Sequence, residues 1–159
     1  MKTKIRFANE CDTSLILGFI KELAEYEKMS DEVVADESLL RKWIFEKKLA
    51  SVIFAVEDGK EVGFALYFYN FSTFVGRAGI YLEDLFVKPE YRGRGHGKAL
   101  IKELAKIAVS EGCGRLEWAC LDWNTPSIEF YLSLGAEQMN DWTVYRLSGE
   151  SLKTFAEKK

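Results

Sequence analysis

The stretch Tyr81–Ser110, YLEDLFVKPEYRGRGHGKALIKELAKIAVS, predicts a strand, a glycine-rich turn and a helix in succession. Residues 81–87 are rich in aromatic and branched side chains, and Pro89 ends the strand because proline has no amide for a ladder. From about Gly95 onward, apolar residues recur at helical spacing. The first amides of a helix have no internal partner and carry the positive end of the helix dipole. The turn at residues 92–97 is therefore a candidate anion site.

The glycine spacing in this turn excludes two common phosphate loops. A P-loop has four residues between its glycines and then Lys-Ser or Lys-Thr, whereas three residues separate Gly93 from Gly97 and alanine follows Lys98. A dinucleotide fingerprint requires its third glycine where Lys98 stands. The pattern that fits is Arg-x-x-Gly-x-Gly, formed by Arg92, Gly95 and Gly97 after a strand.

Length and composition favour a single domain over residues 1–159, because 48% hydrophobic residues supply a core and 30% charged residues cover it. The sequence has no run of about eighteen apolar residues and no basic-then-apolar leader, so we expect a cytoplasmic protein without a membrane partner. A formal charge of -3 disfavours nucleic acid, whose binding requires clustered positive charge. It suits a cationic partner better.

The sequence has too few cysteine and histidine residues for a fold held by disulfides or by a metal ion. Cys11, Cys113 and Cys120 form no CxxC pair and leave one cysteine over, and the single histidine, His96, lies in the glycine turn. We therefore expect neither a disulfide nor a metal site.

The remaining patterns predict a mixed α/β domain with one sheet. Asp58-Gly59 is a strong signal for a two-residue hairpin turn between two of its strands. The expected strands are 5–7, 52–56, 62–69, 81–87, 116–121 and 143–147, and the expected helices are 13–26, 38–44, 95–108, 124–134 and 148–155.

The chain resembles the GCN5-related N-acetyltransferases (GNAT), and within them the diamine N-acetyltransferases of the spermidine/spermine type. The joint occurrence of several motifs in order carries this resemblance. They are Ile20-Lys21-Glu22-Leu23-Ala24 with Tyr26-Glu27, Val62-Gly63-Phe64-Ala65, Tyr81-Leu82-Glu83-Asp84, Tyr91-Arg92-Gly93-x-Gly95-x-Gly97, and Trp123-Asn124-x-Pro126-Ser127-Ile128-x-Phe130-Tyr131 before Gly135-Ala136.

The resemblance implies a mostly antiparallel sheet with helices on both faces, in which splayed central strands form a cleft for acetyl-CoA. It also implies a homodimer. The cofactor-binding residues that it implies are Leu85, Phe86 and Val87 for the pantetheine arm, Arg92, Gly93, Arg94, Gly95, His96, Gly97 and Lys98 for the pyrophosphate, and Asn124 and Ser127 for the far end of the arm.

Acetyl transfer to an amine requires two proton movements. An alkylammonium with a pKa of about 10 must lose a proton before its direct attack on the thioester, and the departing thiolate is helped by an acid. The resemblance implies Glu83 as the proton acceptor, directly or through water, and Tyr131 as the acid. Without the surrounding motif, a core tyrosine with a satisfied hydroxyl would be the favoured interpretation of Tyr131.

Carboxylates suit the binding of a cationic amine, and the substrate-binding residues implied by the resemblance are Tyr26, Glu27, Glu83 and Asp84. Successive strand residues face opposite ways, so Glu83 and Asp84 reach one cleft only if the strand is bulged between them. Glu27 reads nearly as well as part of a solvated, acidic connector.

Two stretches depart from the diamine enzymes. Leu132-Ser133-Leu134 replaces a basic run after the tyrosine, and the loop Asn70–Phe74 lacks their acidic residue and tryptophan. A smaller aminoalkyl substrate, such as a lysine analogue with sulfur in its chain, therefore fits as well as a polyamine. The alternatives left open are a non-catalytic acetyl-CoA-binding regulatory domain, a GNAT enzyme acting on a protein or peptide amine, and a single-stranded nucleic-acid binder.

Overall fold

The computed structural model describes residues 3–159, which form two compact units, one ending at Ala119 and one spanning Cys120–Lys159. The elements of the first unit are β1 (Lys4–Phe7), η1 (Glu10–Asp12), α1 (Thr13–Tyr26), η2 (Ser30–Glu32), α2 (Glu37–Leu40), η3 (Arg41–Glu46), β2 (Ser51–Glu57), β3 (Lys60–Ser72), β4 (Arg77–Val87), η4 (Pro89–Tyr91), α3 (His96–Ser110) and β5 (Leu116–Trp118). Those of the second unit are α4 (Thr125–Ser133) and α5 (Gly149–Glu157).

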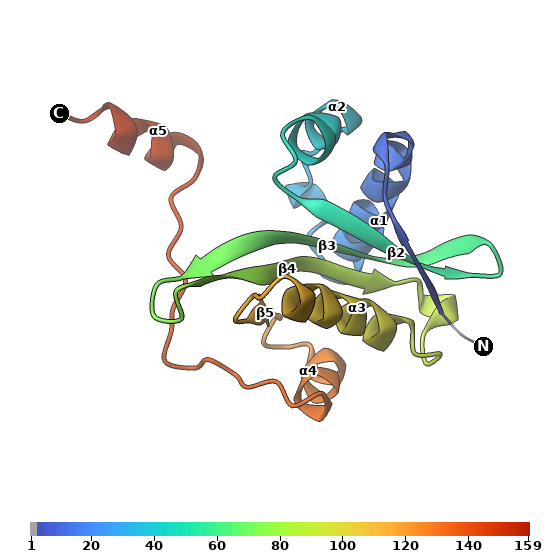
Figure 1. Ribbon diagram of the computed structural model, residues 1–159. Helices are drawn as coiled ribbons and strands as arrows, with labels where there is room; N and C mark the ends of the chain where they lie inside the picture. Colours follow the sequence, from blue (N-terminus) through green and yellow to red (C-terminus); the bar gives the residue numbers. More distant parts are fainter. Residues whose placement is uncertain (1–2) are drawn as a thin grey trace. The chain divides into compact units, whose positions relative to one another are not determined.

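The first unit is built on one sheet with the strand order β1-β2-β3-β4-β5. The first four strands pair antiparallel, and β5 runs parallel to β4. In Figure 1, α1 and α2 lie on one face of this sheet and α3 lies on the other. The expected mixed, mostly antiparallel sheet with helices on both faces is confirmed.

The core on the α1 face is aromatic. Phe19 of α1 stacks on Phe64 of β3, with ring centroids 5.1 Å apart, and lies 5.9 Å from the ring of Phe54 on β2. All three side chains are almost fully buried, and each contributes about 2–3 kcal/mol by leaving water. Phe86 of β4 belongs to the same cluster, so the strand that opens the glycine turn is fixed by the core.

Strand β4 contains a bulge at Glu83. Leu66 of β3 pairs with Asp84, but the next residue, Tyr67, pairs with Leu82, so Glu83 has no residue opposite it. An extra residue disrupts the alternation of side chains between the two faces. Glu83 and Asp84 were expected to reach one cleft only if the strand is bulged between them, and this bulge is present.

The pairing between β4 and β5 is short. β5 contacts β4 only along Ile80–Leu82, and no other strand of residues 3–159 continues on that edge toward Val87. On the other edge, the Lys88 amide donates to the carbonyl of Val62 at 2.9 Å. Since hydrogen-bonded pairs alternate in an antiparallel ladder, the backbone groups of Leu85 and Val87 face the open edge, whereas the Phe86 amide faces β3.

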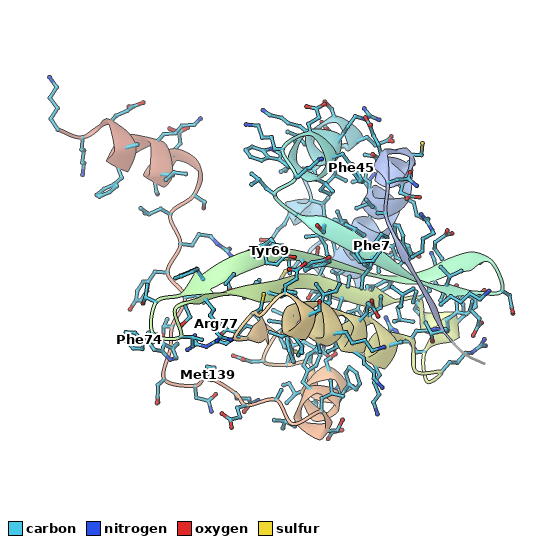
Figure 2. The ribbon with its side chains drawn as sticks, in the orientation of Figure 1. Phe7, Phe45, Tyr69, Phe74, Arg77 and Met139 are labelled. Atoms are coloured by element: carbon cyan, nitrogen blue, oxygen red, sulfur yellow. The ribbon has the colours of Figure 1, made fainter. Side chains whose placement is uncertain are left out.

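Several expected elements differ from the structure, and the expected strand 116–121 is shorter, ending at Trp118. β3 extends as far as Ser72, and β4 already begins at Arg77. Most of the loop expected before Tyr81 is therefore part of a long hairpin, with Phe74 at its tip (Figure 2). The expected strand 143–147 is wrong: these residues form no ladder, because strand-like alternation needs a neighbouring strand that residues 3–159 do not supply. The second helix has one α-helical turn, capped by Asp36, before it widens into the π-helix η3.

Candidate active site

The turn between β4 and α3 presents unpaired backbone amides. Gly93 and Gly95 have φ angles of 77° and 86°, which glycine adopts without strain. The first amide of α3 with a backbone acceptor is that of Ala99, which donates to the Gly95 carbonyl. Within residues 3–159, the amides of residues 93–98 donate to no backbone oxygen. The turn therefore has the donor geometry of an anion site.

Arg92 ties this turn to β4. Its Nε donates to the Val87 carbonyl at 2.9 Å, and its guanidinium lies 4.9 Å from the ring centre of Tyr26 and 5.2 Å from that of Phe86. Stacking on two aromatic rings and a hydrogen bond to the strand hold the side chain in place. Tyr26, expected at the substrate, thus also supports the turn.

Arg94 and His96 direct their side chains to Glu57, a residue that the sequence did not single out. Arg94 Nη1 donates to Glu57 Oε2 at 2.6 Å, and His96 Nε2 lies 3.1 Å from Glu57 Oε1. His96 Nδ1 lies 3.0 Å from the hydroxyl of Thr3. Glu57 and His96 are both buried, whereas Lys98 is exposed on α3. No spacing or motif in the sequence connects Glu57 with the turn.

Three carboxylates gather at the bulge of β4. Glu27, at the end of α1, and Asp84 are half-buried, whereas Glu83 is exposed. Burial and, after it, the charges of Glu83 and Glu27 raise the pKa of Asp84 to about 7. Burial and then Glu83 also raise the pKa of Glu27. The cluster is short of positive charge and suits an ammonium group.

The same strand carries Tyr81, whose pKa responds to its burial and to nearby carboxylates. Burial, followed by the charges of Glu83 and Glu117, raises the pKa of Tyr81. The Tyr81 ring lies 5.2 Å from that of Phe68. The phenol therefore stays protonated at neutral pH.

Three expected site residues, Asn124, Ser127 and Tyr131, belong to the second unit. Asn124 is buried and caps α4, with its side-chain oxygen accepting from the Ser127 amide at 3.4 Å. Tyr131 is half-buried on α4, and its ring centre lies 5.6 Å from that of Phe130. The roles of Asn124 and Ser127 at the cofactor and of Tyr131 at the thiolate stay predictions.

Two searches over residues 3–159 gave negative findings. No helix in this range is both long enough and apolar enough to cross a bilayer. No group of three or more His, Cys, Asp or Glu side chains in the same range is arranged to hold a metal ion.

Comparisons with known proteins agree with this arrangement. Residues 18–136 match the model of the acetyltransferase (GNAT) family. A thialysine N-epsilon-acetyltransferase of Bos taurus is 41% identical, over 97% of each chain. A human spermidine/spermine N(1)-acetyltransferase-like protein is 33% identical over 96% of this chain and 24% of its own length.

Among solved structures, an integron cassette protein from the mobile metagenome of V. cholerae is similar in fold, with a TM-score of 0.82. It is 32% identical, and the match covers 99% of each chain. The family match spans β3, β4, the glycine turn and α4, which together carry most of the expected site residues. The chain belongs to the acetyltransferase (GNAT) family and is an N-acetyltransferase.

Proposed function

We propose that the protein transfers an acetyl group from acetyl-CoA to the primary amine of a small cationic substrate, either a diamine or polyamine or an aminoalkyl amino acid such as thialysine. The observation that carries this proposal is the sequence of features along β4. An acidic cluster at its bulge, an open backbone edge at Leu85 and Val87, and an anion turn at its end follow one another within a single strand and its connection.

The donor site fits acetyl-CoA in two respects. The amides of residues 93–98 match the oxygens of a pyrophosphate, and glycine at 93, 95 and 97 keeps side chains out of the approach. The backbone groups of Leu85 and the amide of Val87 match an amide-bearing pantetheine arm, in the way that an added strand extends a sheet. Acetyl-CoA supplies the acyl thioester.

The amine site is the carboxylate cluster. Burial and, after it, the charges of neighbouring carboxylates raise the pKa values of Glu27 and Asp84. A bound ammonium relieves the repulsion between these carboxylates and favours the ionised form of each. The cluster therefore selects a compact positive charge over a neutral amine or an alcohol.

The proton movements are assigned to residues of this chain. Glu83 takes the proton from the bound ammonium, directly or through water, while Asp84 and Glu27 hold the substrate's charge. Tyr131 gives its phenolic proton to the departing thiolate, since a phenol with a pKa of about 10 is protonated at neutral pH. The backbone at the open edge of β4 is the donor available to the thioester oxygen.

The choice among amines rests on the relatives. Bovine thialysine N-epsilon-acetyltransferase matches this chain over nearly its whole length, and thialysine is a lysine analogue with sulfur in its side chain. The hairpin at Asn70–Phe74 carries no acidic residue for a second distant ammonium. We therefore rank a thialysine-like substrate above a long polyamine.

The proposal includes a cytoplasmic homodimer without nucleic-acid or membrane partners. Apolar side chains of the segment after α4 support self-association: Trp142, Val144 and Tyr145 are 77%, 85% and 91% exposed. Strand-like alternation of apolar residues without a ladder suits pairing with a second copy. The formal charge of -3 supports the exclusion of nucleic acid.

An assay of thiol release from acetyl-CoA with thialysine, lysine, ornithine, putrescine and spermidine tests the proposal. We expect the highest kcat/KM with thialysine. The Tyr131→Phe variant is expected to lose about 10²–10³-fold in kcat while binding CoA normally. Turnover with protein amines alone would refute the small-substrate assignment, and an unchanged Tyr131→Phe rate would remove Tyr131 from the mechanism.

A further inference from the structure

The glycine turn alternates glycines with anchored side chains. Gly93, Gly95 and Gly97 alternate with Arg94 and His96, and both of these side chains reach the carboxylate of Glu57. Glycine backbones have the largest conformational freedom to lose, and a turn with left-handed φ at two positions needs an external constraint to stay in one shape. Glu57 contacts side chains of the turn on both sides of Gly95.

The position of Glu57 is itself fixed. It is the last residue of β2 and pairs with Lys60 across a two-residue turn. Asp58 and Gly59 in that turn have φ angles of 50° and 77°, the positive values of a tight hairpin. Its side chain is 5% exposed and that of His96 is 2% exposed. The anchor therefore belongs to the rigid sheet rather than to the turn.

The two contacts of Glu57 are specific in their hydrogen-bonding roles. A carboxylate only accepts, so His96 Nε2 carries a proton toward Glu57 Oε1, and Arg94 donates to Oε2. His96 Nδ1 is then available to accept from the Thr3 hydroxyl. Both oxygens of one buried carboxylate are engaged, which orients the turn from two points.

We propose that Glu57 is a positioning residue for the acyl donor: through Arg94 and His96 it holds residues 93–98 with their amides directed at the donor's diphosphate. Arg94 then serves the turn by its contact with Glu57 rather than as a phosphate ligand. This inference rests on the proposed use of acetyl-CoA as the donor. In this proposal Glu57 acts only through Arg94 and His96.

The test compares acetyl-CoA with S-acetylpantetheine, which carries the same thioester and arm but no diphosphate. In the Glu57→Leu variant we expect the KM for acetyl-CoA to rise about tenfold, with kcat within about twofold of the wild type. The kinetics with S-acetylpantetheine should be unchanged. An equal loss with both donors would mean a general structural defect and would overturn the proposal.

Arg94→Leu provides a second variant, because a half-exposed side chain is replaced without a buried void. Alone, we expect it to raise the KM for acetyl-CoA severalfold, and in the Glu57→Leu background to add almost nothing. Residues that act through one contact are non-additive in a double-mutant cycle. Additive losses would show that Arg94 binds phosphate directly, contrary to the proposal.

Glu61→Leu is the matched control. Glu61 lies on the same hairpin and its carboxylate pairs with Arg6 at 2.9 Å, away from the turn. We expect a lowered melting temperature with an unchanged KM for acetyl-CoA.

Calorimetric titration with CoA tests the proposed donor separately from the proposed role of Glu57. If the wild type does not bind CoA, the proposed donor and the role of Glu57 are both wrong; if it binds CoA and Glu57→Leu binds equally well, only the role of Glu57 is wrong.

Discussion

Burial and, after it, the carboxylate of Glu83 raise the pKa of Glu27, although one residue ends helix α1 and the other forms the bulge of β4. Asp84, next to the bulge, is affected by both. Without the extra residue, Glu83 and Asp84 would face opposite sides of the sheet. The bulge thus concentrates negative charge at the place where a cationic amine is proposed to bind.

Replacement of Asp84 by asparagine is expected to stabilise the protein at alkaline pH. The pKa of Asp84 rises on folding from 3.8 to about 7, so the folded state binds more protons between these values and stability falls as pH rises through this window. The loss of folding stability caused by ionised Asp84 is fully present above pH 7. Allowing for solvent screening, we expect Asp84→Asn to add about 2 kcal/mol at pH 8.

Thermal unfolding at pH 8 and pH 4 measures this effect. A gain of about 2 kcal/mol corresponds to about 4–8 °C in Tm for a chain of this size. It should nearly vanish at pH 4, where the carboxyl is protonated in the folded state and close to half protonated in the unfolded state. The control is Asp31→Asn, at an exposed position on η2. An Asp84→Asn protein that is less stable than the wild type at pH 8 would contradict the burial of this charge.

Binding of the amine is expected to release a proton from Asp84. Near pH 7 this carboxyl is about half protonated, and an ammonium beside it favours the ionised form. The substrate itself stays charged up to about pH 10. We therefore expect affinity to rise by up to about tenfold between pH 6 and pH 8.

Calorimetry in two buffers with different ionisation enthalpies counts the released protons. About half a proton should be released at pH 7 by the wild type, and almost none by Asp84→Asn. A dissociation constant that is the same at pH 6 and pH 8 would mean that the substrate's charge does not contact this carboxylate.

Glu83→Gln is expected to lower kcat by about 10²-fold, because the amide takes no proton from the substrate. The loss should shrink at pH 9–10, where more of the amine is neutral in solution. Steady-state rates across this pH range measure both effects. The control is Glu25→Gln, at an exposed position of α1, which should behave as the wild type. A Glu83→Gln rate that stays equally depressed at every pH would argue for a role other than proton transfer.

Tyr145→Asp is expected to convert the proposed dimer into monomers at micromolar concentration. A charge placed in an apolar contact is desolvated without a partner. Light scattering coupled to size-exclusion chromatography measures the mass. Thr154→Asp, exposed on α5, should remain dimeric. A wild-type protein that elutes as a monomer would refute the homodimer.

Local signals in the sequence predicted the elements that local interactions determine. The Asp58-Gly59 turn has the expected positive φ values, and α3 begins at His96, directly after the glycine that was expected to open it. These features depend on residues close together in the chain, which is the information that spacing and propensity contain.

Features that depend on distant residues were predicted less well. The stretch 70–79 was expected to be a loop, but Asn70–Ser72 and Arg77–Gly79 pair in the ladder between β3 and β4, and only residues 73–76 form the turn. The sequence allowed either a regular strand, with Glu83 and Asp84 on opposite faces, or a bulged one. The register with β3 decides for the bulge. Glu57 was missed, because its contacts with Arg94 and His96 join the β2–β3 hairpin to the turn before α3, and no sequence pattern connects the two.

The contacts of Arg92 and Arg94 have one more consequence. Both guanidinium groups of the turn already have protein acceptors, the Val87 carbonyl and the Glu57 carboxylate. The donor's phosphates would then meet oriented amide dipoles at short range more than free cations. Because screening acts mainly on separated, solvent-exposed charges, we expect the affinity for acetyl-CoA to change little as ionic strength rises, unlike that of a site made of mobile lysines.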